Sequence, residues 1–244
     1  MPVTSKRAFT LVELLVIVGI ISLLVTILMP SLARAKQLAR EAMCLTRLGG
    51  QVRAIYLYAM DNRGRIPVGP ANPLGSTYPY EGMPDVPCNT VATNRLWIGM
   101  LKTYDGCGAL IKAQMPFEEG FFCPGDDSSD PVQELAKLRD RGGADAHGSY
   151  LYRQLDQTRS ARWSDLGTND EGWPAKALMM DMNCRMPGYM LRTNHGGKKV
   201  NVAYVDGHCS SHDNQLDPYT LREQDTPNPF TRLDEILKYA DRHE

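Results

Sequence analysis

An almost unbroken apolar run occupies residues 8–29 near the start of the chain. About 20 consecutive apolar residues are enough for a helix to cross the hydrocarbon core of a membrane. Lys6 and Arg7 precede the run, and basic flanks tend to stay on the cytoplasmic side. One acidic residue, Glu13, interrupts the run. The pattern predicts a single membrane-spanning helix, with the rest of the chain outside the cytoplasm.

After Pro30 the apolar pattern takes a helical period. Apolar residues return mostly at steps of three or four, at Leu38, Ala42, Leu45, Val52, Ile55 and Ala59. The pattern stops before Gly64, which can take the left-handed conformation that ends many helices. We expect one helix over about residues 10–61, with bends at Pro30 and at residues 49–50, where two glycines weaken a turn.

Two short segments predict strands of an antiparallel sheet. Residues 177–181 are mostly apolar, and residues 200–205 show a two-residue alternation. Asp206 and Gly207 follow, and an Asp-Gly pair supplies the positive φ angles of a two-residue hairpin turn. Residues 208–212 should therefore return as an antiparallel strand.

The remaining segments complete the prediction of an α+β fold. Residues 231–241 have the period of an amphipathic helix, with Thr231 and Asp234 spaced as a capping box. Residues 66–119 are rich in proline and glycine and predict ordered loops, with a short helix over residues 95–101. We expect a long N-terminal helix packed on a small antiparallel sheet, as one globular head.

The 244 residues are 43% hydrophobic and carry a net charge of −1, which is ordinary for a globular domain once the apolar run is set aside. No nucleic-acid-binding motif occurs, so we expect no nucleic acid partner. The chain has six cysteines, at Cys44, Cys88, Cys107, Cys123, Cys184 and Cys209. Outside the cytoplasm, cysteines without a Cys-x-x-Cys pair predict disulfides rather than zinc. We expect at least two disulfides among the five after Cys44, with the pairing open, and Cys44 free or bonded to the head.

Residues 8–13, with the sequence AFTLVE, resemble the type IV prepilin signature that type II secretion pseudopilins share. The resemblance implies that a prepilin peptidase cleaves between Ala8 and Phe9 and methylates the new amino group of Phe9. It also implies that Glu13 neutralises an amino terminus, usually that of a neighbouring subunit, during assembly. Because a charge at membrane depth is costly, Glu13 needs such a partner. Ala8 replaces the usual glycine but is similarly small.

Two other interpretations of this segment remain open. A secretory signal peptide has a basic start and an apolar core, but its core is typically only 7–15 residues long. A plain single-pass anchor fits the length of the run but leaves Glu13 unexplained.

Residues 194–199, with the sequence NHGGKK, lead into the second predicted strand and then to Asp206 and Gly207. This arrangement resembles the C-terminal, processing-associated signature of a large prepilin-like family, in which nine residues separate a His from Asp-Gly. Here ten residues separate His195 from Asp206. Residues 44–67 and 122–126 extend the resemblance. We expect His195 to hydrogen-bond the Asp206 carboxylate or the backbone, and metal binding is the minor alternative.

Asp126, Asp127 and Asp130 offer hard oxygen ligands at the close spacing of a calcium loop. Some secretion pseudopilins bind calcium in their C-terminal loops, so the resemblance keeps Ca²⁺ as a candidate ligand. The alternative is a solvated turn, and no cofactor is required by either interpretation.

Taken together, the resemblance implies a leader at residues 1–8, a transmembrane helix half at 9–29, a periplasmic stalk at 30–64 and a head at 65–244. The expected function is a structural subunit of a type IV pilus-like or type II secretion pseudopilus filament, in the cytoplasmic membrane with its head in the periplasm or extracellular space. Its implied partners are prepilin peptidase, copies of itself, other pseudopilins and an inner-membrane assembly platform. An anchored ligand-binding or adhesin-like minor pilin is the alternative. We expect no enzyme, because hydrolase, zinc-protease and phosphate-loop motifs are absent from the sequence.

The mature chain should begin at a methylated Phe9, because residues 8–9 would lie at the cytoplasmic face with Lys6 and Arg7 held inside. The intact mass of membrane-extracted protein measures this directly. A chain that starts at Met1 or after Ala35 would contradict the prediction.

Overall fold

The computed structural model describes residues 10–67, 91–99, 102–113, 118–126, 130–155, 162–168, 171–186, 190–225 and 229–243. The chain divides into two compact units, Met1–Ala39 and Arg40–Glu244. Helix α1 (Leu11–Asp61) contributes residues to both units. Residues 40–64, expected as part of a stalk, therefore belong to the globular unit.

Helix α1 confirms the long helix expected from the sequence, and it continues as one helix through Pro30 and the two glycines at 49–50. Gly64 follows its end with a φ of 78°, and the Gly64 N–H donates to the Ala59 carbonyl at 2.7 Å. The left-handed ending predicted for this helix is therefore confirmed.

The described part of the first unit exposes a large apolar surface. Large hydrophobic side chains from Leu11 to Leu32 are exposed to solvent. An 18-residue window of α1 has a mean hydropathy of 2.9, and none of that window is buried. Helix α1 is therefore long and apolar enough to span a membrane.

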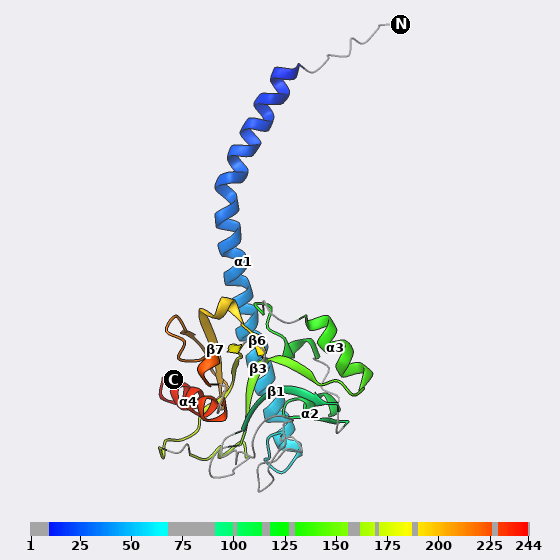
Figure 1. The fold of residues 1–244 in the computed structure, drawn as a ribbon, viewed down its shortest axis with the longest axis vertical. Coiled ribbons are helices and arrows are strands. Elements are labelled where there is room, and N and C mark those ends of the chain that lie inside the picture. The colour runs from blue at the N-terminus through cyan, green and yellow to red at the C-terminus, as the bar shows by residue number, and fades with distance from the viewer. Residues whose placement is uncertain are drawn as a thin grey trace. The chain divides into compact units, whose positions relative to one another are not determined.

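The second unit is built on an antiparallel sheet with the strand order β2-β1-β3-β4-β7-β8. Figure 1 labels β1, β3 and β7 of this sheet. Its strands are β1 (Val91–Ile98), β2 (Thr103–Tyr104), β3 (Ala146–Leu155), β4 (Ala177–Asp181), β7 (Lys199–Tyr204) and β8 (Cys209–Asp213). A smaller sheet, in the order β6-β5-β9, contains β5 (Cys184–Met186), β6 (Met190–Arg192) and β9 (Leu221–Arg222). The connecting helices are α2 (Gly108–Lys112), η1 (Glu118–Phe121), α3 (Pro131–Asp140), η2 (His195–Gly197), η3 (Glu223–Asp225) and α4 (Pro229–Arg242).

Helices α1 and α4 bury their apolar residues in two different core clusters. From α1, one cluster takes Cys44, Leu48, Val52 and Ile55. From α4, the other takes Leu233, Ile236, Leu237 and Ala240. Neighbouring residues of β7 alternate between them, since Val202 belongs to the α4 cluster and Ala203 to the α1 cluster. The two helices therefore cover opposite faces of the main sheet.

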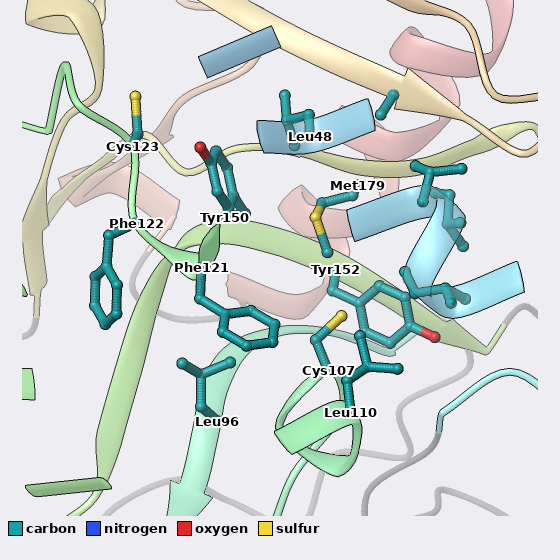
Figure 2. Close-up of a cluster of buried hydrophobic side chains, with 14 of the residues drawn as sticks. Leu48, Leu96, Cys107, Leu110, Phe121, Phe122, Cys123, Tyr150, Tyr152 and Met179 are labelled. Carbon is teal, nitrogen blue, oxygen red and sulfur yellow. The ribbon is translucent and has the colours of Figure 1, made fainter. Parts of the chain in front are cut away.

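Figure 2 shows the cluster on the α1 side of the sheet. Leu48 comes from α1, Tyr150 and Tyr152 from β3, and Met179 from β4. All four side chains are almost fully buried. Burial of such side chains stabilises a fold by roughly 1.5–3 kcal/mol each, so this face supplies much of the stability that holds α1 in the globular unit.

The predicted strands at residues 177–181 and 200–205 are confirmed as β4 and β7. The predicted return strand is also confirmed, because β7 pairs antiparallel with β8. The turn between them is longer than expected: the Tyr204 N–H donates to the His208 carbonyl, which leaves residues 205–207 as the loop. Gly207 has a φ of 92°, the positive value that the Asp-Gly pair predicted.

The short helix predicted at residues 95–101 is wrong, because residues 95–98 lie in β1. Apolar residues at 96–98 fit either structure by periodicity alone, and pairing of β1 with β2 and β3 decides for the strand. The Trp97 ring meets the Tyr104 ring edge-on at 5.0 Å between centroids. Helix α2 and strand β2 also lie within the segment expected as loops, of which residues 68–90, 100–101 and 114–117 fall outside the described part.

The expected C-terminal helix is confirmed as α4, but it begins earlier than predicted, at Pro229. Thr231 is therefore inside the helix, and the predicted capping box with Asp234 is wrong.

The expected disulfides are contradicted. None of the five cysteines in the described residues forms a disulfide, and Cys88 lies outside that part of the chain. Their positions explain why. Cys184 lies in the α4 cluster, whereas Cys107 lies in the α1 cluster on the other face of the sheet. Cys209 is half-buried on β8 and lies beside Gly49 of α1. A β-carbon added at Gly49 would lie 3.7 Å from the Cys209 sulfur. Cys44 is not exposed on a stalk, as its position in the sequence suggested, but fully buried.

A buried ion pair fastens α4 to the main sheet. Arg153 on β3 donates from Nη2 to Asp241 Oδ2 on α4 at 2.9 Å, and both side chains are almost completely buried. The other Asp241 oxygen accepts the backbone N–H groups of Lys176 and Ala177, each at 2.8 Å. Asp241 thus supplies three acceptor contacts between the terminal helix and the sheet.

Asp241→Asn should lower the free energy of unfolding by about 3–5 kcal/mol, because it leaves the Arg153 guanidinium buried without a counter-charge. Glu235→Gln is the matched control, since the Glu235 side chain on the same helix is 53% exposed and its pair with Arg232 is worth less than about 1 kcal/mol. Denaturant unfolding of the full chain in detergent, followed by circular dichroism, measures both. Equal midpoints for the two variants would show that the Arg153–Asp241 pair does not hold α4.

Candidate functional site

The N-terminal candidate residues lie in the first unit. Ala8 and Phe9 fall outside the described residues. Glu13 lies in the first turn of α1, where its Oε2 accepts the Thr10 N–H at 2.9 Å and the Thr10 hydroxyl at 2.7 Å. The Glu13 N–H donates back to the Thr10 hydroxyl at 3.2 Å. These reciprocal bonds form a capping box, so Glu13 helps to start the helix. The Thr-x-x-Glu spacing could have revealed this from the sequence.

A second set of candidate residues lies inside the globular unit. Cys44, Cys123, Asp181 and His195 each offer one ligand atom, and these atoms all lie within 4.8 Å of one another. We call these four residues the Cys₂AspHis cluster. Their side chains are buried; that of His195 is 2% exposed and that of Asp181 is 0% exposed.

The contacts within the Cys₂AspHis cluster form a chain from one cysteine to the other. Cys44 Sγ donates to Asp181 Oδ1 at 3.1 Å. Asp181 Oδ2 lies 3.5 Å from His195 Nε2, and the same nitrogen lies 3.3 Å from Cys123 Sγ. The Asp181 and Cys123 contacts thus meet at one atom of the imidazole ring.

Four separate segments deliver these side chains. Cys44 comes from α1, Cys123 from the residues after η1, Asp181 from the end of β4 and His195 from the start of η2. Asp181 is placed by the fully buried strand β4, and Cys44 by the helix face that packs on the sheet.

The backbone at His195 is held in an uncommon conformation. His195 has a φ of 53° and is followed by Gly196 at 64° and Gly197 at 68°. A left-handed residue other than glycine costs free energy, and such residues gather at functional sites. The His195 N–H donates to the Gly125 carbonyl at 2.8 Å, which ties η2 to the segment that carries Cys123.

Two asparagines orient the Asp181 carboxylate. Asn194 Nδ2 donates to Asp181 Oδ1 at 3.0 Å. Asn201 donates to Asp181 Oδ2 from both its backbone N–H and its Nδ2, each at 2.9 Å. Asn201 Nδ2 also lies 3.1 Å from His195 Nε2. Its Oδ1 is buried without a hydrogen-bond partner, so the amide is oriented by its two donor contacts.

The two sulfur atoms have polar neighbours of their own. The Tyr150 hydroxyl lies 3.5 Å from Cys44 Sγ, and the Gly125 N–H donates to Cys123 Sγ at 3.2 Å. Figure 2 shows Tyr150 with its hydroxyl turned toward the same side as the Cys123 sulfur. A donor aimed at sulfur, as the Gly125 N–H is at Cys123, favours the thiolate over the thiol.

Burial and mutual contacts shift the ionisation of the Cys₂AspHis cluster. Burial raises the pKa of the Asp181 carboxyl and of the Cys44 thiol. The contact with Cys44, followed by that with His195, lowers the pKa of the Cys123 thiol. Burial works against a charged His195, but Cys123 and Asp181 outweigh it and raise the pKa of that imidazole. The last two shifts favour a Cys123 thiolate, the form in which cysteine binds metals.

The structure corrects the expected role of Asp206. Instead of contacting His195, the Asp206 carboxylate accepts the His208 N–H at 3.0 Å and lies 2.6 Å from His208 Nδ1. It closes the β7–β8 hairpin locally, whereas His195 turns into the core toward Asp181. The two halves of the sequence signature therefore have separate structural roles.

The candidate calcium residues have other contacts in the described part of the chain. Asp126 Oδ2 accepts the Ser149 hydroxyl at 2.6 Å, and Asp130 Oδ1 accepts the Val132 N–H at 2.9 Å as the cap of α3. Asp127 lies outside the described residues. Calcium binding here stays a prediction.

Sequence reasoning missed Asp181 as a site residue, although it predicted the strand that ends there. A carboxylate at the end of an otherwise apolar buried strand is the available signal, because such a residue needs partners in the core. The three sequence blocks that carry the family resemblance contribute Cys44, Cys123 and His195, and these converge on that carboxylate.

Comparisons with protein-family models, with curated proteins and with solved structures found no match.

The arrangement of the Cys₂AspHis cluster differs from that of a cysteine–histidine–aspartate catalytic triad. In a triad, the nucleophile and the acid bond opposite nitrogens of the imidazole ring. Here Cys123 and Asp181 both approach Nε2 of His195. The acid therefore does not orient the ring from its far side, and the four possible ligand atoms instead lie within 4.8 Å of one another.

Gly125→Ala should destabilise the cluster, because a β-carbon there would lie 2.6 Å from His195 Cε1 and displace the ring. We expect a loss of about 1–3 kcal/mol, as for other overpacked sites. The matched control is Gly143→Ala, where a β-carbon would meet nothing within 4 Å. Thermal unfolding of both variants in detergent checks this. A Gly125→Ala protein as stable as the control would mean that His195 is not held against Gly125.

Proposed function

We propose that this chain is a prepilin-like structural subunit, whose apolar N-terminal helix packs into a pilus or secretion pseudopilus filament and whose globular unit lies outside the cytoplasm. The observation that carries the proposal is the exposed apolar part of α1 with Glu13 in its first turn. Glu13 is the only acidic residue between positions 8 and 40.

The position of Glu13 suits a carboxylate that receives an amino terminus. Cleavage before Phe9 would create a new ammonium group one residue from Thr10, whose N–H and hydroxyl already bond Glu13. The helix N-terminus also carries a partial positive charge that favours an acidic side chain in the first turn. Inside a membrane, a carboxylate next to the ammonium of its own or a neighbouring chain is far less costly than an isolated charge.

The continuity of α1 supports the same proposal. One helix supplies both the exposed apolar residues of the first unit and buried residues of the globular unit, such as Leu48 and Ile55. A subunit built this way can join a helical filament through its apolar part, because the exposed apolar surface needs lipid or neighbouring helices to cover it.

Replacement of the carboxylate tests the proposal. Glu13→Val should insert into the membrane and be cleaved normally, because it removes a charge from the apolar segment. Incorporation into filaments should nevertheless fall by roughly tenfold or more, because a neighbour's ammonium would lose its counter-charge. Sheared surface fractions or cross-linked ladders, compared at equal cleavage, measure incorporation.

Thr10→Ala is the control that separates assembly from helix capping. It removes the hydroxyl of the capping box but keeps the Glu13 carboxylate. We expect Thr10→Ala filaments at close to the wild-type level. If both variants lose incorporation equally, Glu13 acts as a helix cap; if Glu13→Val assembles normally, the carboxylate has no role in assembly.

A further inference from the structure

We propose that the Cys₂AspHis cluster binds one Zn²⁺ ion, with Cys44 Sγ, Cys123 Sγ, an Asp181 oxygen and His195 Nε2 as its four ligands. The four atoms already lie within 4.8 Å of one another. This inference is independent of the proposed filament function, because it depends only on the globular unit.

The separations within the cluster fit tetrahedral zinc. Zinc bonds of about 2.3 Å to sulfur and about 2.0 Å to nitrogen or oxygen place neighbouring ligand atoms roughly 3.3–3.8 Å apart. Three of the ligand pairs lie at 3.1, 3.3 and 3.5 Å, namely Cys44–Asp181, Cys123–His195 and His195–Asp181. Small movements of side chains in their present orientations would complete the site.

The donor set selects the metal. Two sulfurs, one imidazole nitrogen and one carboxylate oxygen match the ligands of Zn²⁺, whereas Ca²⁺ and Mg²⁺ prefer oxygen ligands. A closed site with four protein ligands and buried side chains is typical of a structural zinc rather than a catalytic one, which keeps one position open. The sequence did not predict this because its cysteines are not spaced as a Cys-x-x-Cys pair.

The neighbours of the ligands form the supporting contacts that metal sites need. Asn194 and Asn201 hold the Asp181 carboxylate, and the Gly125 N–H donates to Cys123 Sγ. The Tyr150 hydroxyl can donate to a Cys44 thiolate from its present position. On binding, zinc would replace the proton that Cys44 shares with Asp181 and would take the Nε2 position that Asn201 now contacts. Two protons, one from the Cys44 thiol and one from the Cys123–His195 pair, would pass to solvent.

A zinc ion here would cross-link the fold. Its ligands come from α1, the segment after η1, the end of β4 and the start of η2, which lie far apart in the sequence. Metal bonds that close such long loops lower the conformational entropy of the unfolded chain. The ion would therefore stabilise the packing of α1 on the sheet.

The main competing outcome is a disulfide between Cys44 and Cys123. The structure has no disulfide between them. Cys44 contacts Asp181, and Cys123 contacts His195. A disulfide would remove both sulfur ligands and leave only Asp181 and His195, which are too few to form the tetrahedral zinc site.

The experiment uses the full chain, purified in detergent without chelator. We expect about one zinc per chain by elemental analysis. After removal of zinc with a chelator, added Co²⁺ should give the sulfur-to-cobalt charge-transfer band and the strong visible bands of a tetrahedral thiolate site. Zinc should also raise the unfolding temperature of the metal-free chain, because it binds only the folded state.

Matched variants locate the ion. Cys123→Ser and His195→Asn should lose the cobalt spectrum, whereas Cys209→Ser and His208→Asn should keep it, because these change the same residue types outside the cluster. Tyr150→Phe keeps all four ligands and the shape of the core. It should weaken zinc affinity about tenfold, as expected for the loss of one supporting hydrogen bond.

The following results would overturn the proposal. One is a wild-type chain without zinc that shows no cobalt–thiolate spectrum when metal is added. Another is zinc that stays at the wild-type level in Cys123→Ser, because it would then sit elsewhere. A third is an isolated chain whose peptide map contains a Cys44–Cys123 disulfide. If Tyr150→Phe binds zinc as tightly as the wild type, the Tyr150 hydroxyl does not support a Cys44 thiolate, and Cys44 is not a zinc ligand in the orientation described.

Discussion

The buried carboxylate of Asp181 is the interaction on which the arrangement of the globular unit depends. It accepts hydrogen bonds from Asn194, from Asn201 and from Cys44 on α1, and it lies beside His195. A buried carboxylate is costly unless nearly every acceptor position is satisfied. Asp181 therefore constrains η2, β7 and α1 to meet at the end of β4, and the polar residues there form a connected set.

That connected set sits at the border of the apolar core. Cys44, Cys123 and Tyr150 are counted among the buried residues that pack with Leu48 and the rest of the α1 cluster. Apolar packing brings α1 to the sheet, but it is non-directional. The polar contacts of Cys44 add direction, because a hydrogen bond or a metal bond requires particular atoms at particular distances.

The two units of the chain accommodate an acidic side chain in different ways. In the first unit, the Glu13 carboxylate accepts the N–H and the hydroxyl of Thr10 at the start of the helix. In the globular unit, Asp181 is enclosed and depends on side chains from distant segments. A local solution can be read from a four-residue spacing such as Thr-x-x-Glu, whereas an enclosed one depends on contacts that only folding creates.

The sequence by itself determined the long helix, its ending at Gly64, strands β4 and β7, the return of β8 and the terminal helix. Each follows from a local period or from the backbone freedom of one glycine. Only the tertiary structure decided that residues 95–98 form a strand, since their apolar side chains fit a helix equally well until β3 pairs with them. It also decided that Asp206 contacts His208, that the described cysteines form no disulfide, and that His195 meets Asp181 and Cys123. The physical reason is that periodicity reports which face of an element is buried, whereas the partners of a buried polar atom are set by segments far away in the chain that share the same core.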